Sequence, residues 1–264
     1  VDNGGTLTNA GTVNGSIENR FRLTSTGTIN GNLINGATAT LSGRINGGIF
    51  GSGSVTLSGT LRVSGTVELV PNGVFDLANR GASIGGLAGR GEVRVGSGNL
   101  NININGDTTT TFAGVISGTG SINKFGDGTL NLVSVDRTSG VHTFTGLTLI
   151  NGGTLVLGEG AGLAGSVQNN SSSFVNAGTV GGIVRMTLGA TTINTGTFAG
   201  GAINGGTLTS TGIINGELSN VGRAVLAGRI NGTFVNSASA SLSGALTVTG
   251  AFSQDNSQTR TAHP

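Results

Sequence analysis

Short motifs recur at a constant spacing, and this regularity limits the fold more than any other feature of the chain. In the N-terminal quarter, similar tripeptides begin at Gly11, Gly27, Gly43 and Gly59, each 16 positions after the one before. A comparable series occupies the C-terminal part, at spacings of 18 and then 16 positions, and begins at Gly178, Gly196, Gly212, Gly228 and Gly244. Similar motifs at constant spacing indicate a solenoid of stacked units, each of which contacts only its neighbours.

The two series are also related to each other. Residues 25–48 align without a gap to residues 210–233, a shift of 185 positions, and 15 of the 24 aligned residues are identical. We therefore predict one continuous solenoid over 1–254, with related repeat arrays at 1–67 and 176–253 and a tail at 255–264.

Within a repeat, apolar and polar residues alternate in short runs such as Ala39 to Leu41, and Asn-Gly pairs interrupt them. Period-2 alternation bounded by Asn-Gly predicts short strands joined by tight turns. Asn-Gly is equally a signal for two-residue antiparallel hairpins, which are the main alternative. We favour the corners of a parallel β-helix, because stacking then places like motifs on one another. The fold class predicted is all-β, a β-solenoid with coils of about 16–20 residues and longer coils within 68–117.

The composition supports an ordered β array and excludes several kinds of site. Gly accounts for 52 of 264 residues but Pro for only 2, and 9% are charged, while Val, Ile, Leu and Thr are evenly dispersed. The net charge of +2 and the lack of any Lys/Arg run argue against nucleic acid as a partner. Without Cys, disulfides and thiolate metal sites are excluded. No apolar run approaches the ~20 residues of a membrane-spanning helix.

The segment 106–158 contains four motifs in a fixed order. They are "FAGVISGTG" from Phe112, "KFGDGTLNL" from Lys124, "TFTGLT" from Thr143 and "INGGTL" from Ile150. As an ordered set they resemble the passenger-associated transport repeat of bacterial autotransporters, which use type V secretion. Two positions depart from the family pattern, because Phe144 stands where Tyr is expected and Leu147 where a second Gly is usual.

This resemblance implies the right-handed form of the parallel β-helix. It also implies a passenger exposed on, or released from, the outer membrane surface of a Gram-negative bacterium, whose coils fold outside the cell. We accordingly expect a signal peptide before Val1 and a membrane barrel after Pro264, so that this chain is a fragment that meets a membrane only through that barrel.

The second motif holds the only lysine of the chain. The resemblance implies that this element helps the passenger to fold as it emerges. The residues themselves predict a corner, in which two glycines allow a tight turn and the next strand follows. We expect an exposed pair between the lysine and the aspartate, worth about 0–1 kcal/mol. The predicted structural motif comprises Lys124, Gly126, Asp127, Gly128, Thr129 and Leu130.

Matches to catalytic and nucleotide-binding motifs are weak. Ser83 fits a G-x-S-x-G pattern and residues 160–165 fit G-x-G-x-x-G, but neither precedes a helical pattern, which both motifs require. His142 is predicted to be a surface residue, and His263 belongs to the predicted tail. We therefore predict no catalytic residue, no metal site and no cofactor.

The surface residues of the sequence suggest ligand binding and not catalysis. Arg80, Arg90 and Arg94 form a candidate ligand surface for anionic glycans, although Glu92 lies among them and a solvated face is the simpler interpretation. The threonines of 108–111 resemble part of an ice-binding ladder, but the chain's threonines do not keep one fixed coil position.

The sequence as a whole predicts a non-enzymatic stalk or adhesin, with surface glycans or proteins, or further copies of itself, as partners. The first alternative is a secreted β-helix enzyme that cleaves polysaccharide, which requires clustered carboxylates. The second alternative is a simple glycan-binding or ice-binding solenoid. The acidic residues that such an enzyme could recruit are sparse, namely Asp76, Glu92, Asp107, Asp127 and Asp136.

Overall fold

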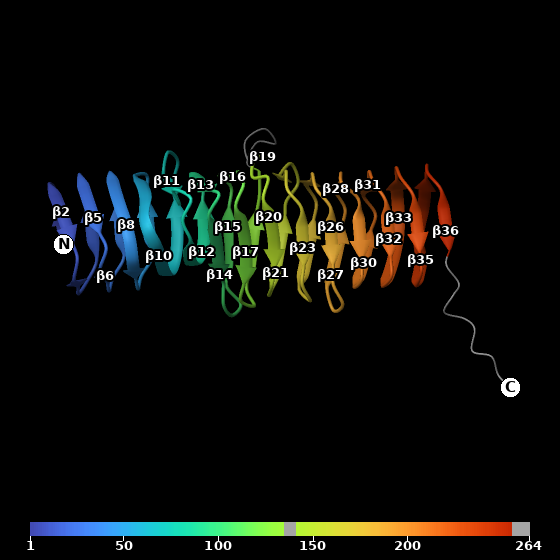
Figure 1. Cartoon of the computed structure of the whole chain (residues 1–264), viewed down its shortest axis with the longest axis horizontal. Coiled ribbons are helices and arrows are strands. Elements are labelled where there is room, and N and C mark those ends of the chain that lie inside the picture. Colours follow the sequence, from blue (N-terminus) through green and yellow to red (C-terminus); the bar gives the residue numbers. More distant parts are fainter. Residues whose placement is uncertain (135–140, 255–264) are drawn as a thin grey trace.

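The chain forms a rod of stacked β-strands, with its first and last strands at opposite ends of the rod (Figure 1). The computed structural model describes residues 1–134 and 141–254, and the predicted tail lies outside them. Over the described residues there is no helix, and the strand pairings are parallel from the first coil to the last. A parallel β-solenoid of about 14 turns confirms the predicted fold class and excludes hairpins for these strands. The right-handed form stays a prediction.

Each turn has three faces, which we name A, B and C in chain order. Face A contains β1 (Asp2–Asn3), β4 (Ile17–Asn19), β7 (Leu33–Asn35), β9 (Ile49–Gly51), β15 (Thr109–Phe112), β18 (Thr129–Leu132), β21 (Thr154–Leu157), β24 (Ser173–Asn176), β27 (Thr191–Asn194) and β30 (Thr207–Ser210). Face B contains β2 (Thr6–Asn9), β5 (Arg22–Ser25), β11 (Val74–Asp76), β13 (Glu92–Gly96), β16 (Val115–Gly118), β19 (Val141–His142), β22 (Gly162–Leu163), β25 (Thr179–Val180), β28 (Thr197–Phe198) and β31 (Ile213–Ile214).

The remaining strands belong to face C or turn a corner between faces. Face C contains β3 (Thr12–Val13), β6 (Thr28–Ile29), β14 (Asn99–Asn103), β17 (Ser121–Phe125), β20 (Leu147–Ile150), β23 (Val167–Asn169), β26 (Val184–Met186), β29 (Ala202–Asn204), β32 (Leu218–Asn220), β34 (Phe234–Asn236) and β36 (Phe252–Gln254). Strands that continue around a corner are β8 (Thr38–Ile45), β10 (Ser54–Leu69), β12 (Ala82–Gly89), β33 (Arg223–Ile230) and β35 (Ser239–Val248).

Coil length varies along the rod. Near the N-terminus Asp2 pairs with Glu18, a step of 16 positions, and the same step returns near the C-terminus. In the centre the steps are longer, because Gly89 pairs with Phe112 and Thr129 pairs with Thr154. The ladders continue through these coils, so the added residues that the structure describes lie between the strands, at the corners. Longer coils within 68–117 are confirmed, and the longest coils exceed the predicted range.

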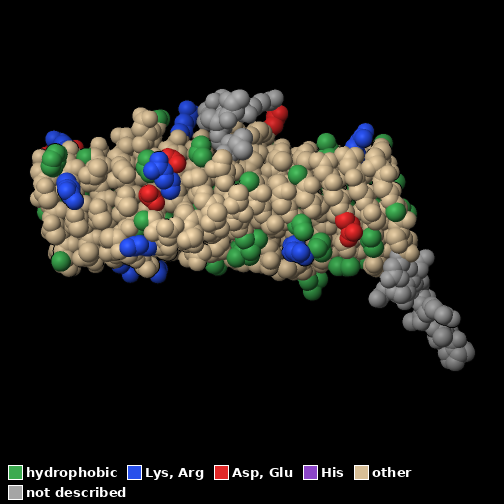
Figure 2. Space-filling view, turned by 45° about the horizontal axis from the view of Figure 1, so that its top comes forward, with side chains coloured by type: hydrophobic (Ala, Val, Ile, Leu, Met, Phe, Trp, Pro, Cys, Tyr) green, Lys and Arg blue, Asp and Glu red, His purple; other side chains and the backbone are tan. Residues whose placement is uncertain are grey.

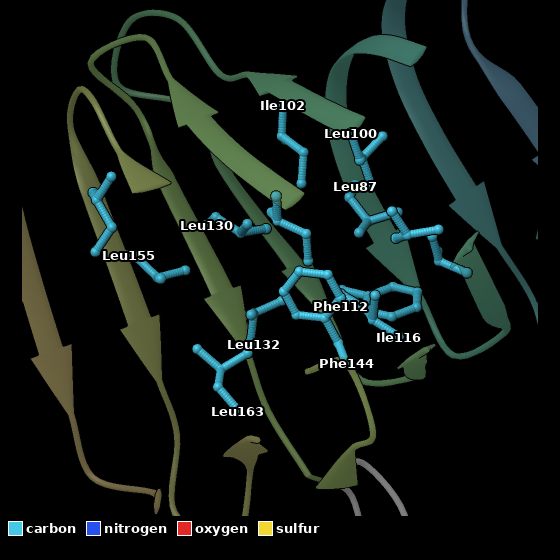
Figure 3. Packing of buried hydrophobic residues seen from close by; sticks show 14 of the residues in the cluster. Leu87, Leu100, Ile102, Phe112, Ile116, Leu130, Leu132, Phe144, Leu155 and Leu163 are labelled. Carbon is cyan, nitrogen blue, oxygen red and sulfur yellow. The ribbon is translucent and has the colours of Figure 1, made fainter. Parts of the chain in front are cut away.

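The interior is filled by inward-facing residues from all three faces. Most are aliphatic, and Figure 3 shows how Phe112 and Phe144 fill the centre of the rod between leucine and isoleucine side chains. Near each end, buried asparagines stack in register instead, and the amide of one donates to the side-chain oxygen of the next. These ladders allow polar side chains to be buried without losing their hydrogen bonds.

Candidate functional site

Lys124 of the predicted structural motif points into the solenoid. It lies two residues after the buried Ile122 on β17, and its own side chain is fully buried. Its ammonium donates to three backbone carbonyl oxygens, those of Phe125 at 2.8 Å, Gly126 at 2.9 Å and Gly152 at 3.2 Å. The lysine therefore connects its own corner to the corner of the next coil.

The predicted exposed pair between Lys124 and Asp127 is wrong, because the lysine is inside and the aspartate outside. The Asp127 carboxylate instead accepts a hydrogen bond from the backbone N–H of Gly106, at 2.6 Å. Burial lowers the pKa of Lys124 to about 8, and the charge of Asp127 partly opposes this shift. The ammonium thus remains charged at neutral pH, held by backbone carbonyl groups.

The rest of this motif forms the corner between β17 and β18. Gly126 has a φ of 73°, a conformation that glycine adopts without a steric penalty. Gly128 is buried so closely that a Cβ would overlap the backbone of Thr108. Thr129 begins β18 and the following Leu130 is buried in the core. The geometry is that of a structural corner, and a role in folding outside the cell stays a prediction.

The candidate arginine surface is only partly basic. Arg94 on face B donates two hydrogen bonds to Glu92, at 2.8 and 2.7 Å, and this contact lowers the pKa of the Glu92 carboxyl. Arg90 lines a hollow of about 540 Å³ that also contains Glu92. Arg80 donates to the carbonyl oxygen of Ala78, at 3.3 Å. Figure 2 shows basic and acidic side chains sparsely distributed, and mixed where they gather in the N-terminal half.

Two arginines that the sequence interpretation passed over stack directly on face C. Arg44 and Arg62 are paired positions of neighbouring coils, and neither forms an ion pair within the described part of the chain. Arg62 borders a polar hollow of about 190 Å³ with Ser83 and Asn103. The sequence held no signal for this pair, because the constant spacing of 16 would place Arg44 beside Thr60. A register shift in β10 between Leu57 and Leu61 brings Arg62 there instead.

The weaker motif matches find no catalytic partners. Ser83 lies on β12, with no helix following it in the described chain. His142, predicted at the surface, is instead buried, and its Nδ1 accepts a hydrogen bond from the backbone N–H of Ile116 at 3.1 Å. Burial lowers the pKa of His142 to about 4, so the imidazole is neutral at pH 7. Asp136 and His263 lie outside the described residues.

Within residues 1–134 and 141–254, no group of three or more His, Asp or Glu side chains is placed to hold a metal ion. Nor does that part of the chain include a helix with the length and apolar character needed to cross a membrane.

The fold and the internal ladders define a β-solenoid repeat protein. Among curated proteins, the chain is 33% identical over 113 residues to "Adhesin BmaC autotransporter" of Brucella suis biovar 1 (strain 1330). The match covers 42% of this chain and 3% of that much longer relative. Together with the solenoid fold, it confirms the resemblance to an autotransporter passenger. The name of this relative describes an adhesin, and for this chain a surface location and a non-enzymatic role stay predictions.

No family model matches the chain, and no solved structure does. The assignment of 106–158 to a passenger-associated transport repeat, and the other domain boundaries, therefore stay predictions.

Proposed function

We propose that this chain is a stiff segment of an autotransporter passenger, which carries adhesive surfaces away from the bacterial cell. The similarity to an adhesin is the observation that carries this proposal. The fold supports it, because an uninterrupted stack of parallel coils gives a long rod whose three outer faces are all available for contact. The partners would be glycans or proteins of another surface.

The stacking also gives a physical basis for folding after export. Each coil leaves an open edge of backbone N–H and C=O groups, and the next coil to emerge pairs with that edge. Asparagine ladders favour the correct register, because a shifted coil would leave buried amides without partners. Folding of this kind would draw the chain outward through the membrane.

An adhesion assay tests the proposal. The chain is fused to an unrelated outer-membrane anchor, displayed on a non-adherent bacterium, and the cells retained on an epithelial layer are counted. We expect several-fold more retained cells than with the anchor alone. Retention of no more cells than with the anchor alone would contradict the adhesive role. The enzyme alternative is tested separately, because release of reducing ends from acidic polysaccharides by the purified chain would favour it.

A further inference from the structure

A shallow groove crosses face A in the N-terminal half of the rod. It has a volume of about 650 Å³ and is lined by residues from β9, β10, β12 and β15 and from the corners before them. These strands belong to four successive coils, so the groove runs for about 14 Å parallel to the axis of the rod. The sequence had drawn attention only to its threonines at 108–111, as part of a possible ice-binding ladder.

The groove arises from a change in side-chain size along one outward-facing column. Phe50 pairs with Glu68 across neighbouring coils, and the next positions in this column are Ala88 and Thr111. The small Ala88 forms the floor, together with glycines at the corner. The long coil that ends at Phe112 adds the far wall, because its extra residues place Thr108 beside the groove.

The lining combines an aromatic ring, hydroxyl groups and one carboxylate. The half-buried Phe50 ring packs closely against Gly48, where an added Cβ would approach two ring carbons to 2.8 Å. Glu68 is exposed and makes no ion pair within the described residues. Thr109 and Thr111 present exposed hydroxyls, while the buried Thr110 hydroxyl has no hydrogen-bond partner in that part of the chain.

We propose that this groove binds an uncharged, linear oligosaccharide. A half-exposed aromatic ring offers an apolar surface to the C–H face of a sugar, and the hydroxyl and carboxylate groups match the sugar hydroxyls as donors and acceptors. Glu68 disfavours an acidic sugar by charge repulsion. Glu68 is also the one carboxylate among the described lining residues, whereas glycoside hydrolysis uses a pair, so the groove binds without cleaving. This inference rests on the proposed adhesive function for its biological setting.

Calorimetric titration of the purified chain with sugars tests the proposal. The probes are four neutral tetrasaccharides, namely cellotetraose, maltotetraose, xylotetraose and chitotetraose, with tetragalacturonate as the acidic comparison. We expect at least one neutral sugar to bind, and to bind more tightly than the acidic one. No binding by any neutral probe, or tighter binding of tetragalacturonate, would overturn the proposal.

Variants locate the binding site. Phe50→Ala and Glu68→Gln are each expected to weaken binding about tenfold, which corresponds to the loss of one stacking contact or one charge-assisted hydrogen bond. Ile34→Ala is the matched control, because Ile34 is the exposed neighbour of Phe50 in the same column and lies outside the groove. It should change the affinity less than twofold. Glu68→Gln keeps the size of an exposed side chain, so its result remains interpretable if Phe50→Ala impairs folding.

Unchanged affinity in Glu68→Gln and in a folded Phe50→Ala would place any sugar elsewhere and overturn the proposal. The two proposals also fail separately. Adhesion of displayed cells without sugar binding would reject the groove and leave the adhesive function standing. Sugar binding that these variants abolish, without adhesion, would reject the function and leave the groove standing.

Discussion

The two repeat arrays have the same interior but face different directions. In the first array a buried ladder of Asn3, Asn19 and Asn35 lies on face A, with amide hydrogen bonds of 2.7 Å. Its counterpart in the second array has hydrogen bonds of 2.7 and 2.6 Å, but it lies on face C and consists of Asn204, Asn220 and Asn236. A second pair of ladders behaves alike, since Asn9 and Ser25 lie on face B while Asn194 and Ser210 lie on face A.

The central coils explain this rotation. Their lengths differ from those of the outer coils, so the sequence shift between the two arrays does not correspond to a whole number of turns. Equivalent strands therefore occur one face apart, although each array keeps its own contacts. The comparison teaches that neighbouring coils determine the interior of a solenoid locally, whereas the lengths of distant coils determine the direction in which an outer surface points.

The largest expected effect comes from breaking both ladders at their centres. Asn19 and Asn220 each accept from one asparagine, donate to another and donate to a backbone carbonyl oxygen. Replacing either with Ala removes a hydrogen-bond partner from both buried neighbours in the ladder, at an expected cost of about 2–5 kcal/mol. Because the two environments match, the two costs should agree within about 1 kcal/mol.

Hydrogen exchange of the amides in each array measures these costs locally. Asn30→Ala is the control, since Asn30 belongs to an exposed asparagine ladder, and we expect a change below about 0.5 kcal/mol. Costs that differ by more than about 2 kcal/mol between the arrays would show that their interiors are not equivalent.

The solenoid could be predicted from sequence because its signals are local and repeated. Alternation and constant spacing indicate which residues face inward, and stacking multiplies that signal over many coils. The same alternation also placed Lys124 in phase with Ile122, and His142 in phase with Phe144. The charged and polar character of these two side chains predicts exposure, but the strand period prevails and both are buried.

The groove and the direction of the arrays could not be predicted in this way. Both depend on which residues of successive coils lie side by side, and the coils between Ile49 and Phe112 have unequal lengths. Ala88 is an ordinary small residue in the sequence. It becomes the floor of a groove only because Glu68 and Thr111 are its neighbours in the stack.

The second largest effect is a loss of stability in acid, which we expect in the centre of the rod but not in the two arrays. The centre holds a buried His142 whose pKa is lowered from 6.5 to about 4 by burial, and no described residue of either array is a buried histidine. In the unfolded chain His142 binds a proton below about pH 6.5, whereas in the folded chain it stays neutral down to about pH 4. The folded state is therefore at full stability above pH 6.5 and becomes less stable as the pH falls toward 4. The expected loss is about 3 kcal/mol.

Hydrogen exchange compared at pH 7 and pH 4.5, after correction for the intrinsic rates, resolves the centre from the arrays. Amides around Ile116, whose backbone N–H binds the imidazole, should lose protection relative to both arrays. The variant His142→Gln should show a much smaller difference between the two pH values. If the wild-type chain and this variant respond alike to acid, the histidine is not responsible.

The smallest expected effect concerns the glycines at one corner of each array. Gly27 and Gly212 are equivalent in the alignment of the two arrays, and a Cβ at either position would overlap the carbonyl oxygen of the coil beneath, that of Gly11 or Gly196. Replacement by Ala forces two backbones apart, with an expected cost of about 1–3 kcal/mol that should be equal in the two arrays.

Thermal unfolding of the variants, followed by circular dichroism, measures these differences. Gly11→Ala is the matched control, because a Cβ at Gly11 meets no atom within 4 Å. Its cost should stay below about 0.5 kcal/mol. If Gly27→Ala lowers the stability and Gly212→Ala does not, the two arrays differ in how closely their backbones approach at this corner.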